Sequence, residues 1–304
     1  MDIKDIKNFE NYELKKHTTF KIGGCAKKVW FPKTEEEFVY LLSTLKEPIV
    51  LGGCSNVLVS SAGVDNDVIL TTDLRDFSIE GNIITAQCGV KAPLLSQEAQ
   101  KHGLSGFEFM IGFPGTVGGI VHMNASAHSQ SVSDTCFNAK VFDADSKSVL
   151  NLSKTELAFK YRSSILDKKN YILLSAKFEL KIDDKEQIQT LMKRNLEFRK
   201  TKQPNLTTPN AGSTFKNPPN DSAGRLLELA GAKTLSVGGA KVWSGHANFV
   251  VNTGNAVSKD ISHIMNKMYN MVKEKYTIEL EPEVKFIGIR DNEEEELWNT
   301  MLKK

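Results

Sequence analysis

Short apolar runs separated by polar turns mark the first sixty positions of the chain. Runs at residues 29–31, 49–51 and 57–59 predict β-strands. Thr34 precedes three glutamates, which is typical of a helix N-cap followed by an acidic first turn. Residues 52–56, Gly-Gly-Cys-Ser-Asn, predict a turn between two strands and not the start of a helix.

The middle of the chain continues this mixture of strands and helices. Strand-like runs lie at residues 68–70, 83–86, 140–142 and 171–174. Helical patterns interrupt them at 92–103, ending at a glycine, and at 153–158, where Ser153 and Glu156 have the spacing of a capping box. The order of elements therefore predicts the α+β fold class.

Two longer helices are predicted in the second half. Residues 184–200 place Ile188, Leu191, Met192 and Leu196 on one face, and a domain boundary is expected near 185–205. Residues 258–276 begin with Ser258 as the expected N-cap. They carry an apolar stripe that we interpret as core: Ile261, Ile264, Met265, Met268 and Val272. The acidic tail 291–304 is predicted to be a solvated helix.

Composition limits the classes of function. The 304 residues are 40% apolar and 25% charged with a net charge of +2, so no surface dedicated to nucleic acid is expected. No apolar run is long enough for a membrane helix, and the charged N-terminus lacks the apolar core of a signal peptide. The four cysteines have no metal-ligand spacing, which predicts reduced thiols in a cytoplasmic protein without a metal site.

Two glycine-rich loops, at residues 52–56 and 112–119, are candidates for binding a dinucleotide. Glycines allow the backbone to approach a pyrophosphate, and successive N–H groups can form an anion-binding nest. Neither loop has the Walker A sequence or the glycine pattern of a Rossmann fold. Taken singly, each loop is better explained as a structural turn.

A third polar loop, residues 209–218, holds a serine, a lysine and an asparagine between prolines. Together such groups can offer a proton, a positive charge and amide dipoles to one small ligand. From the residues alone, Ser213 is compatible with an ordinary turn, Arg162 with a solvated charge and Glu283 with a carboxylate at a strand edge.

The segments 111–119, 209–218 and 280–288, in this order, closely resemble the MurB family, the UDP-N-acetylenolpyruvoylglucosamine reductases of peptidoglycan synthesis. Residues 16–24 resemble the N-terminal signature of the same family, and the resemblance extends from about residue 12 to 288. It implies a two-part FAD-binding module, similar to vanillyl-alcohol oxidase (PCMH-like), followed by a C-terminal α+β substrate-binding domain. The implied domains are 1–65, 66–190 and 191–304.

The resemblance also implies noncovalent FAD and NADPH as the hydride donor. The implied FAD-binding residues are Gly52, Gly53, Cys54, Ser55, Asn56, Gly112, Pro114, Gly115, Thr116, Gly118, Gly119 and Ala125. The chain departs from the family at Cys54, where glycine is usual, and at Lys16, where asparagine is frequent. Because a side chain at position 54 restricts the backbone, this departure bears on the affinity for FAD.

Three catalytic residues follow from the same resemblance. Residues 161–164, Tyr-Arg-Ser-Ser, resemble the family's Tyr-Arg-Asp-Ser segment and assign Arg162; Ser213 and Glu283 come from the two later segments. Arg162 would bind the charge that develops on an enolate-like species, Ser213 would donate a proton to C2, and Glu283 would assist. The implied substrate-binding residues are Tyr161, Lys202, Lys216, Asn217, Arg225 and His246.

The expected reaction is reduction of UDP-N-acetylglucosamine enolpyruvate to UDP-N-acetylmuramate, with hydride passing from flavin N5 to C3. Only 51 positions separate Arg162 from Ser213, a spacing similar to that of type II enzymes. Two alternatives stay open: an FAD-dependent oxidase of the same broad fold, and a protein that binds flavin or UDP-sugar without turnover.

Overall fold

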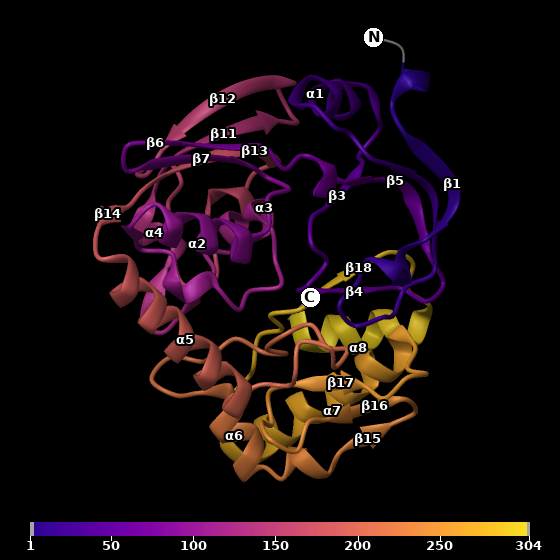
Figure 1. Cartoon of the computed structure of the whole chain (residues 1–304). Coiled ribbons are helices and arrows are strands. Elements are labelled where there is room, and N and C mark those ends of the chain that lie inside the picture. The colour runs from indigo at the N-terminus through magenta and orange to yellow at the C-terminus, as the bar shows by residue number, and fades with distance from the viewer. Residues whose placement is uncertain (1–2, 303–304) are drawn as a thin grey trace. The chain divides into compact units, whose positions relative to one another are not determined.

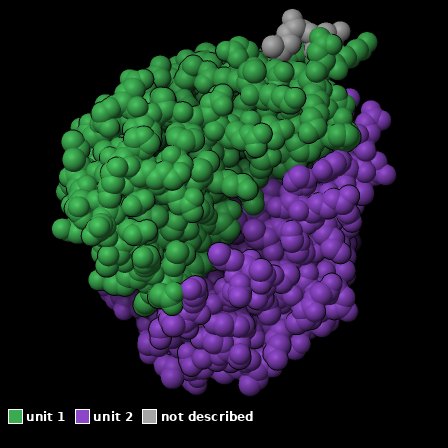
Figure 2. Space-filling model, in the orientation of Figure 1, with its two compact units in different colours: residues 1–9, 29–53, 67–199 green, residues 10–28, 54–66, 200–304 purple. Residues whose placement is uncertain are grey.

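The computed structural model describes residues 3–302 and divides the chain into two compact units (Figure 2). Unit 1 comprises residues 1–9, 29–53 and 67–199, and unit 2 comprises residues 10–28, 54–66 and 200–304. The units therefore interleave along the chain. The consecutive ranges 1–65, 66–190 and 191–304 stay a prediction about functional domains.

Helices and strands alternate through both units, which confirms the α+β class (Figure 1). The helices are α1 (Glu35–Thr44), α2 (Ala92–Lys101), α3 (Val117–His122), α4 (Val132–Thr135), α5 (Lys185–Lys202), α6 (Ala223–Leu229), α7 (Ser258–Tyr276) and α8 (Asn292–Leu302). The strands are β1 (Asn8–Glu13), β2 (Cys25–Trp30), β3 (Ile49–Leu51), β4 (Val57–Val59), β5 (Val64–Leu70), β6 (Phe77–Glu80), β7 (Ile83–Gln87), β8 (Leu104–Ser105), β9 (Ser126–Ala127), β10 (Gln130–Ser131), β11 (Cys136–Asp143), β12 (Ser148–Ser153), β13 (Tyr171–Glu179), β14 (Lys181–Ile182), β15 (Ser236–Val237), β16 (Ala240–Val242), β17 (Val250–Asn252) and β18 (Lys285–Ile287).

Unit 1 is organised around an antiparallel sheet in the order β12-β11-β13-β7-β6. Helix α3 packs on β13 and β7 of this sheet, so its N-terminal loop is held against a rigid surface. The core of the unit joins apolar residues of the sheet with those of α1 and α2, among them Phe38, Leu95 and Phe178. Burial of this apolar surface is the main force that stabilises the unit.

Local signals predicted two helices of unit 1 correctly and a third wrongly. In α1, the hydroxyl of Thr34 accepts a hydrogen bond from the N–H of Glu37 at 3.2 Å, as the N-cap prediction requires. Helix α2 covers most of the predicted range. Residues 154–158 form turns after the end of β12, although Ser153 and Glu156 make the predicted capping bonds. Ala158 has a left-handed φ of 45°, which ends the segment after a single helical hydrogen bond, from the N–H of Leu157 to the carbonyl of Ser153.

Helix α5 forms as predicted, but its buried face differs from the expected one at one position. Ile188 and Met192 are buried, whereas Leu191 is 41% exposed. Asn195, and not Leu191, completes the buried face of the helix. Its side-chain N–H donates to the carbonyl of Glu108 at 3.1 Å. A polar side chain with hydrogen-bond partners can occupy a buried position of a helix, although its polarity predicts that it is exposed to solvent.

Unit 2 contains the antiparallel sheet β15-β16-β17 and the parallel pair of β18 with β4. All five members of the predicted apolar stripe of α7 are buried in the second core. Phe20 and Leu58 contribute to the same core from distant parts of the chain. Segments from both ends of the sequence therefore complete this unit.

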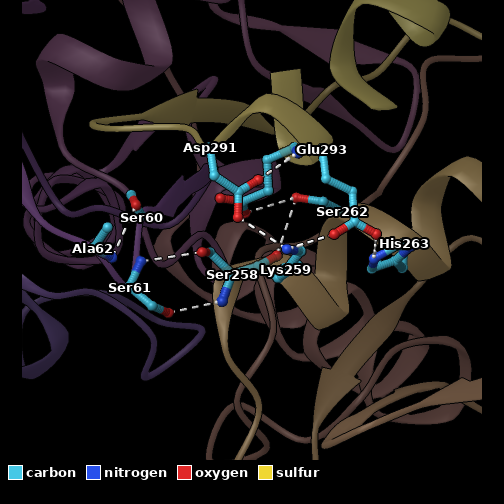
Figure 3. A network of polar contacts seen from close by, with 10 residues as sticks. Ser60, Ser61, Ala62, Ser258, Lys259, Ser262, His263, Asp291 and Glu293 are labelled. Atoms are coloured by element: carbon cyan, nitrogen blue, oxygen red, sulfur yellow. Dashed lines mark hydrogen bonds and ion pairs between the residues drawn. The ribbon is translucent and has the colours of Figure 1, made fainter. Parts of the chain in front are cut away.

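The start of α7 is fixed by a polar network that reaches two other segments of unit 2 (Figure 3). Ser258 is the first helical residue and not the N-cap, which corrects the prediction. Its N–H donates to the hydroxyl of Ser61 at 2.8 Å, and the N–H of Ser61 donates to the hydroxyl of Ser258 at 3.1 Å. A residue far away in sequence therefore supplies the cap that a local pattern assigned to Ser258.

The same network anchors the acidic tail, where Lys259 binds Asp291 and Glu293 (Figure 3). Helix α8 forms as predicted, but it is not fully solvated, because Trp298 is buried and donates to the hydroxyl of Ser262 at 2.9 Å. Among residues 3–302, no helix is both long and apolar enough to cross a bilayer.

Candidate active site

Two glycines of the first predicted flavin loop lie against the second loop, within unit 1. A Cβ atom at Gly52 would lie 2.3 Å from the hydroxyl oxygen of Thr116, and one at Gly53 would lie 3.0 Å from the carbonyl oxygen of Pro114. Any larger residue at these positions would therefore force the loops apart. We call Gly52, Gly53 and residues 114–116 the glycine cradle.

The N-terminus of α3 is largely occupied by contacts with unit 1 itself. The N–H of Val117 donates to the carbonyl of Val90 at 2.9 Å, and the N–H of Gly118 donates to the carbonyl of Cys88 at 2.7 Å. These two donors hold the helix in place and are not directed at a ligand. Gly119 differs, because only atoms of its own helix and its chain neighbours lie within 4 Å of the position of an added Cβ.

The cradle contains a buried hydroxyl suited to a bound ligand. Thr116 is 2% exposed, and its hydroxyl oxygen has no hydrogen-bond partner among residues 3–302. An unsatisfied buried hydroxyl is costly, and a bound polar group would remove that cost. The close glycine backbone, this hydroxyl and the open surface at Gly119 together fit a cofactor such as FAD.

Protein contacts hold the remaining unit 1 candidates for FAD. The N–H of Ala92 donates to the carbonyl of Gly115 at 3.0 Å, and the N–H of Val132 donates to the carbonyl of Ala125 at 3.1 Å. A Cβ at Gly112 would lie 2.8 Å from Cδ of Arg199. These residues shape the loop in the protein alone, and their contact with FAD stays a prediction.

The rest of the first loop, residues 54–56, belongs to unit 2. Cys54 is buried with a left-handed φ of 47°, and burial raises the pKa of its thiol to about 12, so the thiol is neutral. Ser55 is half-buried. Asn56 is tied to a predicted catalytic segment, because its side-chain N–H donates to the carbonyl of Glu283 at 3.1 Å.

Arg162 lies at the tip of a tight turn in unit 1. Lys160 and Ser163 exchange two backbone hydrogen bonds around it, and Arg162 itself has a left-handed φ of 52°. Its guanidinium donates to the hydroxyl of Ser126 at 3.1 Å and lies 5.6 Å from the ring centre of Tyr161. This left-handed conformation is strained for a residue with a Cβ, and the two bonds across the turn maintain it.

A polar pocket of about 340 Å³ opens beside this turn, still within unit 1. It is lined by Asn124, Ser126, Ala127, Ser129, Gln130, Ser131, Asp134 and Tyr161. Asn124 joins the turn to the pocket wall, because its amide donates to the carbonyl of Lys160 at 3.0 Å and accepts from the N–H of Ser133 at 2.9 Å. Asn124 is absent from the sequence predictions.

In unit 2, Ser213 and Glu283 lie on two short paired segments. The N–H of Glu283 donates to the carbonyl of Thr214, and the N–H of Lys216 donates to the carbonyl of Glu281, both at 2.9 Å. Phe215 lies opposite Pro282 in the same antiparallel ladder. The ladder brings the segments that carry Ser213 and Glu283 together. We call residues 213–216 with 281–283 the serine–glutamate strand pair.

Lys216 and Asn217 lie three and four positions after Ser213 and are held by different partners. The ammonium of Lys216 binds the carboxylate of Glu281 at 2.6 Å, and its side chain is only 15% exposed. The side-chain oxygen of Asn217 accepts a hydrogen bond from the N–H of Ala223, at the start of α6, at 3.0 Å. Lys216 therefore supplies a fixed positive charge one residue beyond Phe215.

The other predicted substrate-binding residues of unit 2 differ in how they are engaged. Lys202 is exposed at the end of α5. Arg225 forms a two-bond ion pair with Asp221 on the surface, so a phosphate would compete with this carboxylate. His246 is half-buried, and burial lowers the pKa of its imidazole, which favours the neutral ring.

Asn248 makes three hydrogen bonds to Thr214 and Phe215 of the serine–glutamate strand pair, although it is not among the predicted site residues. It is 3% exposed and lies between the buried residues Ala247 and Phe249. A polar residue inside such an apolar run is the signal that could have singled it out, since buried amides require fixed partners.

Comparison with known proteins shows which protein family the chain resembles. Residues 203–287 match the family model of the UDP-N-acetylenolpyruvoylglucosamine reductase C-terminal domain, and residues 26–150 match that of an FAD binding domain. These matches show an FAD-dependent oxidoreductase.

Curated relatives cover nearly the whole chain. A UDP-N-acetylenolpyruvoylglucosamine reductase of Caldicellulosiruptor bescii is 42% identical over 290 residues, covering 93% of this chain and 91% of that protein. One of Caldanaerobacter subterraneus is 40% identical over 290 residues, covering 94% and 95%. The crystal structure of the Thermus caldophilus enzyme (MurB) matches with a TM-score of 0.80 and 35% identity, covering 93% of this chain and 98% of that one. Similarity of this extent, in sequence and in fold, makes the chain a member of the MurB family of UDP-N-acetylenolpyruvoylglucosamine reductases.

Proposed function

We propose that the protein reduces UDP-N-acetylglucosamine enolpyruvate to UDP-N-acetylmuramate, a step of peptidoglycan precursor synthesis, in the cytoplasm with NADPH as electron donor. The observation that carries the proposal is the serine–glutamate strand pair, which combines Ser213 and Glu283 in one ladder. The names of the relatives support the same substrate.

FAD is the cofactor of the proposed reaction, and the glycine cradle with Thr116 would hold it. Bound FAD would accept hydride from NADPH and deliver hydride to C3 of the enolpyruvyl group. The residues of the chain then have the task of binding the substrate and managing the charge and the proton that this chemistry requires.

Arg162 is proposed to bind the substrate carboxylate onto which charge spreads from C2. A guanidinium can form two parallel hydrogen bonds with a carboxylate and stays charged at all relevant pH values. The turn of residues 160–163 fixes the backbone of Arg162, and the bond to the hydroxyl of Ser126 orients the guanidinium. Such preorganisation is what makes electrostatic stabilisation effective in a transition state.

Ser213 is proposed to donate the proton to C2. A serine hydroxyl is a weak acid in water, so its proton transfer needs support from neighbouring groups. Lys216 contributes positive charge from the same segment, and Glu283 lies on the paired segment, where it could orient the proton path. Loss of the proton from Ser213 requires its later return from solvent, which a carboxyl group can relay.

The experiment that tests this function is NADPH oxidation by the flavin-loaded protein with and without UDP-N-acetylglucosamine enolpyruvate. We expect oxidation that depends on the enolpyruvyl substrate and forms UDP-N-acetylmuramate. Oxidation coupled only to oxygen would indicate an oxidase of the same fold. Tight binding of flavin or UDP-sugar without turnover would indicate a binding protein.

A further inference from the structure

The segment that carries Ser213 has no regular secondary structure of its own, yet its backbone is fully bonded at the next two residues. Thr214 and Phe215 are 2% and 1% exposed. All four of their backbone polar groups have partners, and only one of these partners, the N–H of Glu283, belongs to the serine–glutamate strand pair. The other three come from a single residue, Asn248.

Asn248 bonds this segment as a neighbouring strand would. Its carbonyl accepts from the N–H of Thr214 at 2.9 Å. Its side-chain oxygen accepts from the N–H of Phe215 at 2.9 Å, and its side-chain N–H donates to the carbonyl of Phe215 at 2.8 Å. The side-chain amide thus reproduces the donor and the acceptor of a peptide group, so the segment is held from both sides.

Asn248 is itself held by a histidine ring. Its backbone N–H donates to Nδ1 of His246 at 3.1 Å, which requires an unprotonated Nδ1 and places the ring proton on Nε2. The ring packs against α6, since a Cβ at Gly224 would lie 2.5 Å from Cε1 of His246. The ring of Phe249 packs edge to face against the imidazole, with the two ring centres 5.1 Å apart. The imidazole is thus held by α6 and Phe249, and its hydrogen bond fixes the backbone of Asn248.

We infer that Asn248 is a positioning residue that sets the place of the Ser213 hydroxyl for proton donation, with His246 as its support. The inference rests on the proposed function. The N–H directly after Ser213 binds the backbone carbonyl of Asn248, and the side-chain amide of Asn248 binds both polar groups of Phe215. Loss of the side-chain amide would therefore free the Phe215 peptide group, two residues from Ser213, and loosen the segment that carries the serine. A displacement of about 1 Å at a reacting group can lower a rate on the order of 100-fold.

The test compares Asn248→Ala with Asn252→Ala. Asn252 is a matched control: it is 5% exposed, donates its amide to the carbonyl of Phe20 at 2.9 Å and accepts from the N–H groups of Gly254 and Ala256. Both variants remove a buried asparagine whose side-chain amide donates and accepts hydrogen bonds, so a slower reaction caused by lost stability should appear in both. Only Asn248→Ala is expected to slow reduction of the enolpyruvyl substrate, by about 10- to 100-fold, while NADPH still reduces the flavin at the wild-type rate.

A double substitution separates positioning from a general structural effect. If Asn248 acts through Ser213, Asn248→Ala should slow the enolpyruvyl step little further once Ser213 has been replaced by alanine. Multiplicative losses in the double variant would overturn the inference. Asn248→Asp provides a second variant: it retains the acceptor for Phe215 N–H but opposes an oxygen to the Phe215 carbonyl, so it should slow the enolpyruvyl step at least as much as Asn248→Ala, and a wild-type rate would overturn the inference.

Hydrogen exchange gives a reading that does not depend on turnover. The amide of Phe215, which donates to the side-chain oxygen of Asn248, should lose protection in Asn248→Ala and keep it in Asn252→Ala. Unchanged protection in Asn248→Ala would overturn the inference. If the wild-type protein does not reduce the enolpyruvyl substrate, the proposed function fails, and the exchange experiment still decides whether Asn248 holds this segment.

Discussion

The glycine cradle of unit 1 and the serine–glutamate strand pair of unit 2 acquire a defined geometry by opposite means. In the cradle there is no space for a side chain between Gly52 and Thr116, so the close contact of the two loops depends on glycine having no Cβ. In the strand pair, Asn248 and Glu283 hold the segment after Ser213 through hydrogen bonds between distant residues. We therefore expect larger side chains to disrupt the cradle, and the removal of hydrogen-bonding side chains to disrupt the strand pair.

The largest effect is expected in the strand pair. Ser213→Ala removes the proposed proton donor without changing a backbone bond, since the contacts of the pair use the peptide groups of Thr214 to Lys216. Loss of a general acid lowers a rate on the order of 100- to 10,000-fold. Stopped-flow absorbance should show normal reduction of the flavin by NADPH and slow oxidation by the enolpyruvyl substrate.

Two results would contradict the role of Ser213. An equal loss in both half-reactions would mean that the substitution had damaged the flavin site. A normal rate with substrate would mean that another group donates the proton. Serine at position 163, where the family usually has aspartate, is the matched control, because Ser163→Ala should leave both half-reactions close to wild type.

The next largest effect is expected in the glycine cradle. Gly52→Ala places a methyl carbon where the Thr116 hydroxyl lies, and overpacking of this kind destabilises a protein by about 1–3 kcal/mol. The variant should unfold at lower denaturant concentration and be purified with less FAD. Adding Thr116→Ala should restore much of the stability of the apoprotein, because the clashing oxygen is gone.

Gly119→Ala sharpens this prediction. The added methyl group meets no atom outside its own helix within 4 Å, so the stability of the apoprotein should not fall, since alanine favours a helix. A decrease in FAD affinity without loss of stability would locate the flavin against Gly119. Unchanged FAD affinity would remove Gly119 from the proposed binding residues.

A smaller effect is expected at Cys54. Its left-handed backbone disfavours every residue with a Cβ by about 1–2 kcal/mol relative to glycine. Cys54→Gly relieves this strain but loses burial of the sulfur, so its unfolding free energy should stay within about 1 kcal/mol of wild type. Cys54→Ala loses the sulfur and keeps the strain, and it should be the less stable of the two. The reverse order in denaturant titrations would refute this account.

The smallest effect is a pH dependence at His246. Burial lowers the pKa of this imidazole, so the folded state favours the neutral ring. The resulting stability is present above the ordinary pKa of 6.5 and is lost as the pH falls below it through the folded-state pKa. Because His17 and His128 shift in the same direction, the measurement is the difference in acid-side slope between wild type and His246→Gln. Identical slopes would exclude a contribution from His246.

Local patterns predicted those elements whose determinants are close in sequence. Thr34 caps α1 through an N–H three residues away, and the stripe of α7 faces the core because its spacing matches the helical period. The prediction for Ser258 was wrong because the cap of α7 comes from Ser61. The helix predicted at 153–158 was wrong because two capping bonds cannot offset a left-handed residue in so short a segment.

The sequence by itself determined the α+β class, most helices and, through ordered motifs, membership of the MurB family. Only the tertiary structure decided which groups meet: Thr116 with Gly52, the segment of Ser213 with that of Glu283, and Asn248 with both peptide groups after Ser213. Helical periodicity and capping act over a few residues, so a sequence displays them directly. Contacts between remote segments depend on how the whole core packs, and no local pattern encodes that packing.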